Sequence, residues 1–436
     1  MGHLAGKDIY HKLGEKIDNL TLRTPWNENF HGILKELYTL EEADVIVKMP
    51  FVLSDLNRIM KVTKYGEAKL RGILDSLCSK GLVMDLLLND KYYYSISPLV
   101  VGFFEFTMMR TDGALDRKKI SRLFFRYMMN RPFWNANFGK GARVSIMRTI
   151  PHEDALITGE YVEILDYEKA RKIVESSDKF SIGICSCRHE KFHIGRKKCD
   201  VPLDTCTSFG ISADYLIRRN MAKEVSKSEM LEHFSRSKEM GLVLNADNVK
   251  NNVAFICHCC KCCCNVLLGV SKLGYANTIV TSNFISDIKE DKCTGCGVCV
   301  TKCPVNAIKI DLTEGESPLK KKIPKIDLSI CLGCGVCALK CNAKAVGLIN
   351  RGKRLLTPET TFEKVILTAL EKGTLQNQMF DDPGNITHKF MRGFLGAFLK
   401  LPVTKKTLMS DMFRSVFLSS MKTGVKMQGK EFVSKI

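Results

Sequence analysis

Two runs of cysteines in the last third of the chain repeat one spacing. Each run follows the pattern C-x2-C-x2-C-x3-C: first Cys293, Cys296, Cys299 and Cys303, followed by Pro304, and then Cys331, Cys334, Cys337 and Cys341, followed by Asn342. Cysteine thiolates are the usual ligands of iron–sulfur clusters and of structural zinc. Zinc ribbons normally pair their cysteines two by two, so runs of four at this spacing favour iron–sulfur chemistry.

The paired runs resemble the duplicated motif of bacterial dicluster ferredoxins, over roughly residues 284–350. The resemblance implies two 4Fe-4S clusters, each bound by three cysteines of one run and by the last cysteine of the other. One cluster would take Cys293, Cys296, Cys299 and Cys341, and the other would take Cys331, Cys334, Cys337 and Cys303.

Glycines lie between the cysteines of both runs, at Gly295, Gly297, Gly333 and Gly335. Because glycine lets the backbone wrap tightly round a cluster and aim amide N–H groups at its sulfurs, we expect these four residues to bind the cofactor. Asn342 stands where the pattern usually has a proline, a departure that leaves the ligand set unchanged.

Ten further cysteines precede the two runs, in two groups about fifty residues apart: Cys185, Cys187, Cys199 and Cys206, and then Cys257, Cys259, Cys260, Cys262, Cys263 and Cys264. Six cysteines within eight residues cannot all point inward from one helix or strand, so we expect a tight loop there. We expect the two groups to meet in space and to bind one or two additional iron–sulfur clusters, or one centre that is not a cube.

Polar residues among these ten cysteines leave alternatives open. His189, His193 and His258 could ligate a cluster and raise its potential, or could lie at the surface or behind the ligands. Arg188 could donate hydrogen bonds to an acidic substrate or a cluster sulfur, or could form an ordinary salt bridge. Zinc storage is the alternative for the whole loop, but the neighbouring runs favour iron–sulfur.

The composition limits the class of protein that can carry this chemistry. The 436 residues are 45% hydrophobic and 26% charged, which suits several globular units. The formal net charge is +19, and negatively charged clusters would offset part of it. Charged residues interrupt the first 20 positions, so we expect no secretory signal, no disulfide framework and no membrane span. The sequence therefore predicts a cytoplasmic protein.

The residues before the cysteines predict helices and a hairpin. Helices are expected over 39–49, from Ser54-Asp55 and over 66–80, and two strands over 82–88 and 91–96 with a turn between them. This order is typical of a winged-helix-like unit. The third helix carries nearly balanced charge, so DNA is an unlikely partner, and Cys78 falls on its apolar face as a structural thiol.

The next segment, residues 103–150, interleaves aromatic and basic residues. Such a mixture can bind bases, but an amphipathic helix over about 115–130 that packs its aromatic face into a core is the favoured interpretation.

The C-terminal segment is free of cysteine and basic. Residues 386–436 hold ten Lys or Arg against Asp411 and Glu431, with one apolar stripe around Phe390, Phe394 and Phe398. A basic amphipathic helix of this kind can fold back on the protein's own core, lie on an anionic membrane, or dock on an acidic protein.

Taken together, these features predict a multidomain α+β protein. The expected units are a winged-helix-like domain (1–102), a helical, aromatic connecting region (103–180), a cysteine-rich metal-binding domain (181–283), a ferredoxin-like dicluster domain (284–350) and a basic amphipathic helical tail (351–436). The whole chain resembles ferredoxin-fused proteins of strict anaerobes, and this resemblance implies anaerobic electron transfer.

The favoured function is a relay of low-potential electrons to or from a partner redox enzyme, as the electron-transfer component of an oxidoreductase system. Two alternatives remain: a redox-sensing regulator that binds DNA through the winged helix, and an iron–sulfur enzyme or maturation factor with an open catalytic cluster. No nucleotide or flavin motif is apparent, so electrons should arrive from another protein.

Overall fold

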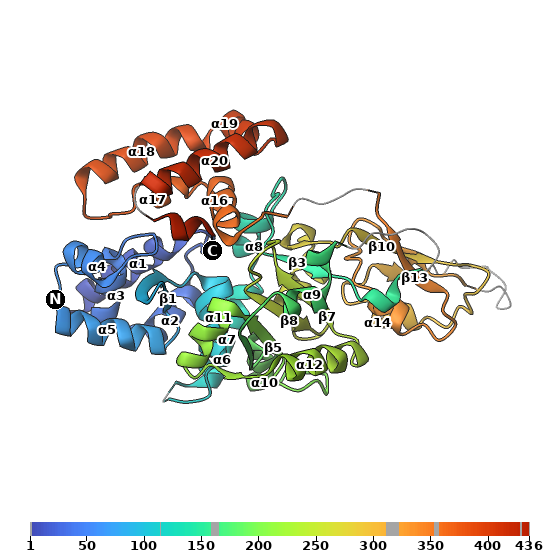
Figure 1. Cartoon of the computed structure of the whole chain (residues 1–436). Coiled ribbons are helices and arrows are strands. Elements are labelled where there is room, and N and C mark those ends of the chain that lie inside the picture. Colours follow the sequence, from blue (N-terminus) through green and yellow to red (C-terminus); the bar gives the residue numbers. More distant parts are fainter. Residues whose placement is uncertain are drawn as a thin grey trace.

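A computed structural model describes residues 2–113, 115–157, 165–310, 322–352, 357–427 and 430–435. The architecture mixes helices and sheet, as the sequence predicts. A central sheet separates the N-terminal helices, at one end of the molecule, from the cysteine module at the other, and the C-terminal helices lie across the N-terminal ones (Figure 1).

The N-terminal part is five helices and a hairpin: α1 (Gly2–Asp18), α2 (Glu28–Leu37), α3 (Leu40–Lys48), α4 (Leu56–Thr63), α5 (Glu67–Ser79), β1 (Val83–Leu88) and β2 (Lys91–Ile96). Thr39 and Glu42 form a reciprocal capping box at the start of α3, and the Asp55 side chain caps α4. Asn89 and Asp90 both have positive φ, which suits the two-residue turn of an antiparallel hairpin. The predicted order of helices and strands is therefore confirmed.

Helix α5 shows how this part is held together. The Cys78 side chain is fully buried on its apolar face, as expected. Three basic side chains of α5 and its C-cap form ion pairs with carboxylates of the same unit: Lys69 with Glu41, Arg71 with Glu67, and Lys80 with Glu42. These three basic side chains are thus each paired within the same unit.

Aromatic side chains form the core between this part and the central sheet. The helices there are α6 (Phe104–Met109), α7 (Arg117–Met128) and α8 (Arg131–Phe138). Tyr127 of α7 and Trp134 and Phe138 of α8 pack around Phe133, while Phe124 of α7 packs against Phe103 and Phe104, and all of these rings are buried. The interpretation of this segment as a packed amphipathic helix is confirmed.

The central sheet has seven strands in the order β6-β4-β5-β8-β7-β3-β9. They are β3 (Met147–Ile150), β4 (Phe180–Gly183), β5 (Cys206–Phe209), β6 (Ala222–Glu224), β7 (Val243–Asp247), β8 (Phe255–Cys259) and β9 (Ile279–Val280). All neighbours are antiparallel except β3 and β9. The helices among them are α9 (Ala170–Glu175), α10 (Ser186–His193), α11 (Gly210–Arg218), α12 (Lys227–Glu239) and α13 (Asn265–Ser271).

The cysteine module follows the sheet. It pairs β10 (Phe284–Ile288) with β13 (Val346–Asn350) and β11 (Ile308–Lys309) with β12 (Lys325–Ile326), and it holds two short helices, α14 (Val298–Lys302) and α15 (Val336–Leu339). The module is joined to the sheet side by a hydrogen bond from the His152 amide to the Cys334 carbonyl (3.1 Å) and by another from the Ile157 amide to the Leu348 carbonyl (3.2 Å).

The C-terminal segment is helical, as expected: α16 (Thr361–Lys372), α17 (Leu375–Met379), α18 (Ile386–Lys400), α19 (Pro402–Leu408) and α20 (Asp411–Met427). Helices α16 and α17 pack on the rest of the protein, and both carboxylate oxygens of Asp381 accept hydrogen bonds from Nη2 of Arg58 in α4. Helix α18 buries only Gly396 and Leu399, so most of its surface faces outward.

Candidate metal centres

The upstream cysteines are brought together by the pairing of two strands. Cys206 opens β5 and lies directly opposite Cys257 of β8. Cys257 and Cys259 are two residues apart on the same strand, so they share one face, and His258 lies on the other. The strand register therefore unites cysteines that are fifty residues apart in the sequence.

The loop after β8 supplies the remaining thiols of the second group. Lys261, Cys262 and Cys263 form a turn, and Cys264 directly precedes α13. Across from it, Cys185 directly precedes α10 and Cys187 lies in the first turn, where its sulfur accepts a hydrogen bond from the Asn265 amide (3.5 Å). The predicted tight loop is present, and it meets the first cysteine group as expected.

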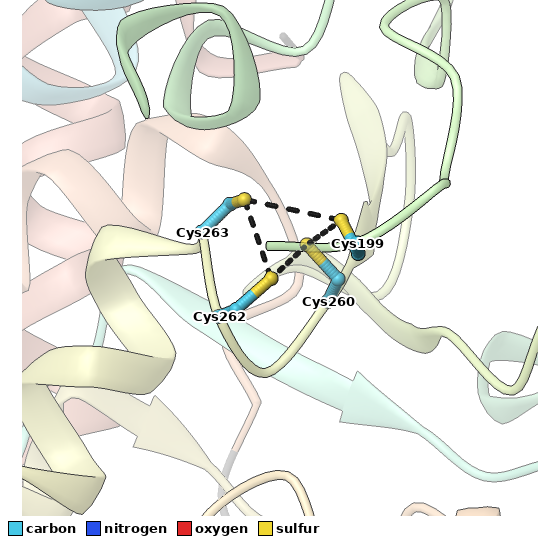
Figure 2. Close-up of side chains that lie close together, drawn as sticks. All are labelled: Cys199, Cys260, Cys262 and Cys263. Carbon is cyan, nitrogen blue, oxygen red and sulfur yellow. Dashed lines mark hydrogen bonds between the residues drawn. The ribbon is translucent and has the colours of Figure 1, made fainter. Parts of the chain in front are cut away.

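The ten cysteines separate into two sets. The first, which we call the tetrad, is Cys199, Cys260, Cys262 and Cys263, whose sulfurs all lie within 4.8 Å of one another. Their side chains point toward a common centre (Figure 2). Four of the six sulfur–sulfur distances are 3.7 Å for Cys199–Cys260, 4.0 Å for Cys199–Cys263, 3.9 Å for Cys260–Cys262 and 3.5 Å for Cys262–Cys263.

The second set, the sextet, comprises the other six: Cys185, Cys187, Cys206, Cys257, Cys259 and Cys264. Neighbouring thiols shift one another's protonation: the Cys206 and Cys259 sulfurs raise the pKa of Cys257, and the Cys264 sulfur raises that of Cys187. The Cys257 thiol, in turn, lowers the pKa of Cys259 to about 6. The sextet is thus one connected group of thiols, of which Cys259 and Cys264 are buried and the other four half-buried.

Arg188 lies between the two sets and is fully buried. Its guanidinium donates to the carbonyls of Pro202 (2.9 Å) and His258 (3.0 Å) and to the Thr205 hydroxyl. Among the described residues no carboxylate pairs with it, and the negative groups that raise its pKa are the sulfurs of Cys185, Cys260 and Cys199. A buried charge needs a counter-charge, so this arginine fits beside metal-bound thiolates.

The three histidines are engaged away from the sulfurs. His258 uses Nδ1 with Ser237 Oγ (2.8 Å) and Nε2 with Thr207 Oγ1 (3.3 Å). His189 Nδ1 contacts the Met108 carbonyl, and its Nε2 contacts that of His193 (2.8 Å). Both ring nitrogens of His258 and His189 have partners, so these two side chains stand behind the cysteines.

In the module, backbone amides point at the cysteine sulfurs. Gly295 N contacts Cys293 Sγ (3.4 Å), Ala307 N contacts Cys303 Sγ (3.1 Å), and Ala345 N contacts Cys341 Sγ (3.3 Å). Gly295, Gly297, Gly333 and Gly335 all have positive φ, as the wrapping of the backbone requires. The turn after Cys341 repeats the one after Cys303, because Lys344 and Asn306 share a positive φ, even though Asn342 replaces the proline.

The two halves of the module differ in exposure. Cys303, Cys331, Cys334 and Cys337 are all buried, and their proximity contributes with burial to raise the pKa of Cys334 and that of Cys337, the latter to about 12. In the other half Cys293 and Cys299 are buried, Cys341 is half-buried and Cys296 is exposed. One half therefore faces the protein interior and the other faces solvent.

The tetrad loop touches the module. Lys261, between Cys260 and Cys262, donates a hydrogen bond from Nζ to the Thr301 carbonyl (3.1 Å). Thr301 lies two residues from Cys299, in the half of the module that faces solvent, and two residues from Cys303, in the buried half. Lys340 Nζ adds a second contact, to the Glu239 carbonyl (2.6 Å).

Sequence reasoning named all the cysteines but not their division into tetrad and sextet. The alternation along β8 could have placed Cys257 and Cys259 together, and the C-x-C-C spacing could have set Cys260, Cys262 and Cys263 apart. Three residues were missed: Asn265 beside Cys187, Ser286, whose Oγ lies 3.2 Å from Cys337 Sγ, and Lys261. Their sequence context carries no signal for these contacts.

Comparison with known proteins supports the module. Residues 292–345 match the family of 4Fe-4S dicluster domains, and the match includes all eight cysteines of the two runs. No curated protein and no solved structure matched the chain. The chain thus carries an iron–sulfur module of ferredoxin-like type.

Within the described residues, none of the helices is both long enough and apolar enough to cross a bilayer.

Proposed function

We propose that this protein relays low-potential electrons between a partner redox protein and a centre at the upstream cysteines. When bound, iron–sulfur clusters supply one-electron oxidation and reduction at low potential. The observation that supports the relay best is the Lys261–Thr301 hydrogen bond, because it holds the upstream cysteine loop against the segment between Cys299 and Cys303.

The module would hold its clusters as the ferredoxin resemblance implies: one on Cys293, Cys296, Cys299 and Cys341, the other on Cys331, Cys334, Cys337 and Cys303. The exposure of Cys296 makes the first site the point of exchange with a partner protein. The buried second site adjoins the central sheet, through the His152–Cys334 hydrogen bond, and would pass electrons inward. Electrons would thus pass between the exposed site and the partner protein, and between the buried site and the upstream cysteines.

The sextet would bind a third iron–sulfur cluster. Its six thiols converge from β5, β8, α10 and the start of α13, and the buried guanidinium of Arg188 supplies positive charge beside them. Six sulfurs exceed the four of a simple cube. The two additional thiols allow a larger cluster, or a cube whose ligands exchange. Either would fit the alternative function of an iron–sulfur enzyme.

Iron and acid-labile sulfide should be counted per chain on anaerobically purified protein, with EPR of the dithionite-reduced state. The relay predicts more than the roughly 8 iron atoms of two cubes, and magnetic coupling between module and upstream signals. A count near 8 with two signals only would contradict a third cluster. A signal that changes on addition of a candidate substrate would favour the enzyme alternative over a pure relay.

We also propose that the relay docks on an anionic membrane surface through α18. Ile386, Phe390, Phe394 and Phe398 recur every four residues along α18, and their exposed fractions lie between 54% and 85%. Exposed aromatic stripes of this length normally have a partner. Lys389 and Lys400 flank the stripe on the same helix and are exposed too, which suits anionic lipid headgroups.

Co-sedimentation with phosphatidylcholine vesicles, with and without 30% phosphatidylglycerol, tests this docking. The intact protein should pellet with the anionic vesicles, and changing Phe390, Phe394 and Phe398 together to Ser should abolish binding. Leu40→Ser removes an equally exposed apolar residue of α3 and should leave binding intact. Absence of binding, or loss of a protein dimer in the triple variant instead, would assign the stripe to a protein partner.

A further inference from the structure

The tetrad is too compact for a cube. In a 4Fe-4S cluster each thiolate binds a different iron atom, so the four ligating sulfurs stand at the outer corners of the cluster, well apart. Four of the six sulfur–sulfur distances in the tetrad instead run from 3.5 to 4.0 Å, and all six are within 4.8 Å. A single ion with metal–sulfur bonds of about 2.3 Å in tetrahedral geometry places its sulfurs about 3.8 Å apart.

Within the part of the chain that the structure describes, the tetrad alone brings four possible ligand atoms this close together. Neither the six cysteines of the sextet nor the eight of the module form such a group. The difference distinguishes one cysteine set from all the others in the same molecule. It does not follow from local crowding alone, because Cys199 reaches the site from the segment after α10, sixty residues away from the loop.

We propose that Cys199, Cys260, Cys262 and Cys263 bind one tetrahedral metal ion, zinc or iron, separate from the iron–sulfur clusters. Four protein thiolates complete the coordination of such an ion, as in structural sites, and leave no open position. The site is separate from the relay and does not depend on it. Its evident effect is to tie the loop that carries Lys261 to the segment after α10.

The surroundings suit the charge of such a site. Four thiolates and a divalent ion carry a net charge of −2, and the Arg188 guanidinium lies beside Cys260 in the buried side of the tetrad. On the outer side, Lys197 donates a hydrogen bond to the Cys199 carbonyl. Two cations therefore border the tetrad, and no carboxylate is among its ligand atoms.

Zinc, iron and sulfide per chain should be measured on the intact protein and on Cys199→Ser and Cys262→Ser. We expect both variants to lose one metal equivalent, with sulfide unchanged. If the ion is zinc, the zinc disappears and the iron stays; if it is iron, one iron is lost without sulfide. Cys206→Ser, in the sextet, is the matched control and should keep the single ion.

X-ray absorption on the intact protein keeps the test independent of how the variants fold. If the ion is zinc, the extended fine structure at the zinc edge should show four sulfur neighbours at about 2.3 Å and no metal–metal scattering. If it is iron, Mössbauer spectra should show one mononuclear iron site beside the cluster irons. Loss of about four iron and four sulfide from Cys199→Ser would identify a cube instead and overturn the proposal. A wild-type protein whose metal is fully accounted for by sulfide-matched iron would overturn it as well, while leaving the relay standing.

Discussion

The module and the upstream region both collect cysteines, but by opposite means. In the module, three of the four ligands implied for each site lie within one short run, and positive-φ glycines and backbone amides shape that run locally. Upstream, strand register, two helix starts and one turn bring together residues up to eighty positions apart. A local site can be recognised from spacing alone, whereas the upstream site depends on the whole sheet.

This difference predicts how each region responds to damage. A module site should lose its cluster and little else, since three of its four ligands lie in one short segment. The upstream site should lose its metal when the fold around it is disturbed, even by a change that removes no cysteine.

The largest expected effect is the loss of a cluster. Cys331→Ser should remove about four iron and four sulfide from the module while the upstream metal stays. Cys187→Ser should do the reverse, because Cys187 contacts only upstream groups, Cys264 and the Asn265 amide. Iron and sulfide analysis with EPR of each variant distinguishes them. Loss of both sets of signals from either variant would show that the regions assemble as one unit.

Arg188→Met should cost about 4 kcal/mol of unfolding free energy in the central sheet and release the upstream metal, without touching a ligand. The reason is that the buried thiolates would lose the positive charge beside them. Amide exchange of β8 and metal content measure both effects. Arg171→Met removes an exposed guanidinium that pairs only with Glu175, and it should leave metal and exchange unchanged.

Gly333→Ala should disturb the module by about 3 kcal/mol and reduce its iron content. Gly333 has a φ of +66°, and an added Cβ would lie 2.1 Å from the Phe284 carbonyl oxygen. Gly352→Ala is the control: its φ is +73°, but nothing lies within 4 Å of the added carbon. Because both glycines have positive φ, both variants share the conformational cost. The difference between them in thermal unfolding and iron content therefore measures the clash at Gly333.

The same contrast explains what the sequence could predict. The helix that starts at Thr39, the Asn89-Asp90 turn, the buried Cys78 and the C-terminal helices all follow from short-range patterns, and the structure confirms them. The division of the upstream cysteines does not, because it depends on Cys206 lying opposite Cys257 across β5 and β8. The contact of Lys261 with Thr301 depends on how the module docks, which no local pattern specifies.

Stability of the upstream region should fall as pH rises, owing to Glu105 of α6. Burial raises the pKa of this carboxyl to about 7. Because the folded state then holds the proton more tightly than the unfolded state, stability is lost between about pH 4.5 and pH 7.

Glu105→Gln keeps an acceptor for the Gly102 amide, which Glu105 Oε2 now binds at 3.0 Å, and removes the charge. Allowing for partial exposure, the variant should be more stable than the parent by about 2 kcal/mol at pH 8 and equal to it near pH 4. Amide exchange of α6 at each pH compares the two proteins. An equal gain at both pH values would rule out the carboxyl charge as the cause.

The smallest effect is expected at the junction of the two regions. Lys261→Met removes one hydrogen bond from a partly exposed ammonium to the Thr301 carbonyl, and Lys340→Met removes another to the Glu239 carbonyl. Each should weaken protection from amide exchange at the junction by about 0.5 kcal/mol. If the regions are separate bodies joined at independent points, the double variant should show the sum of the two losses. A larger loss would mean that the two lysines belong to one cooperative interface. The module could then no longer be treated as a local unit that is independent of the fold-dependent upstream site.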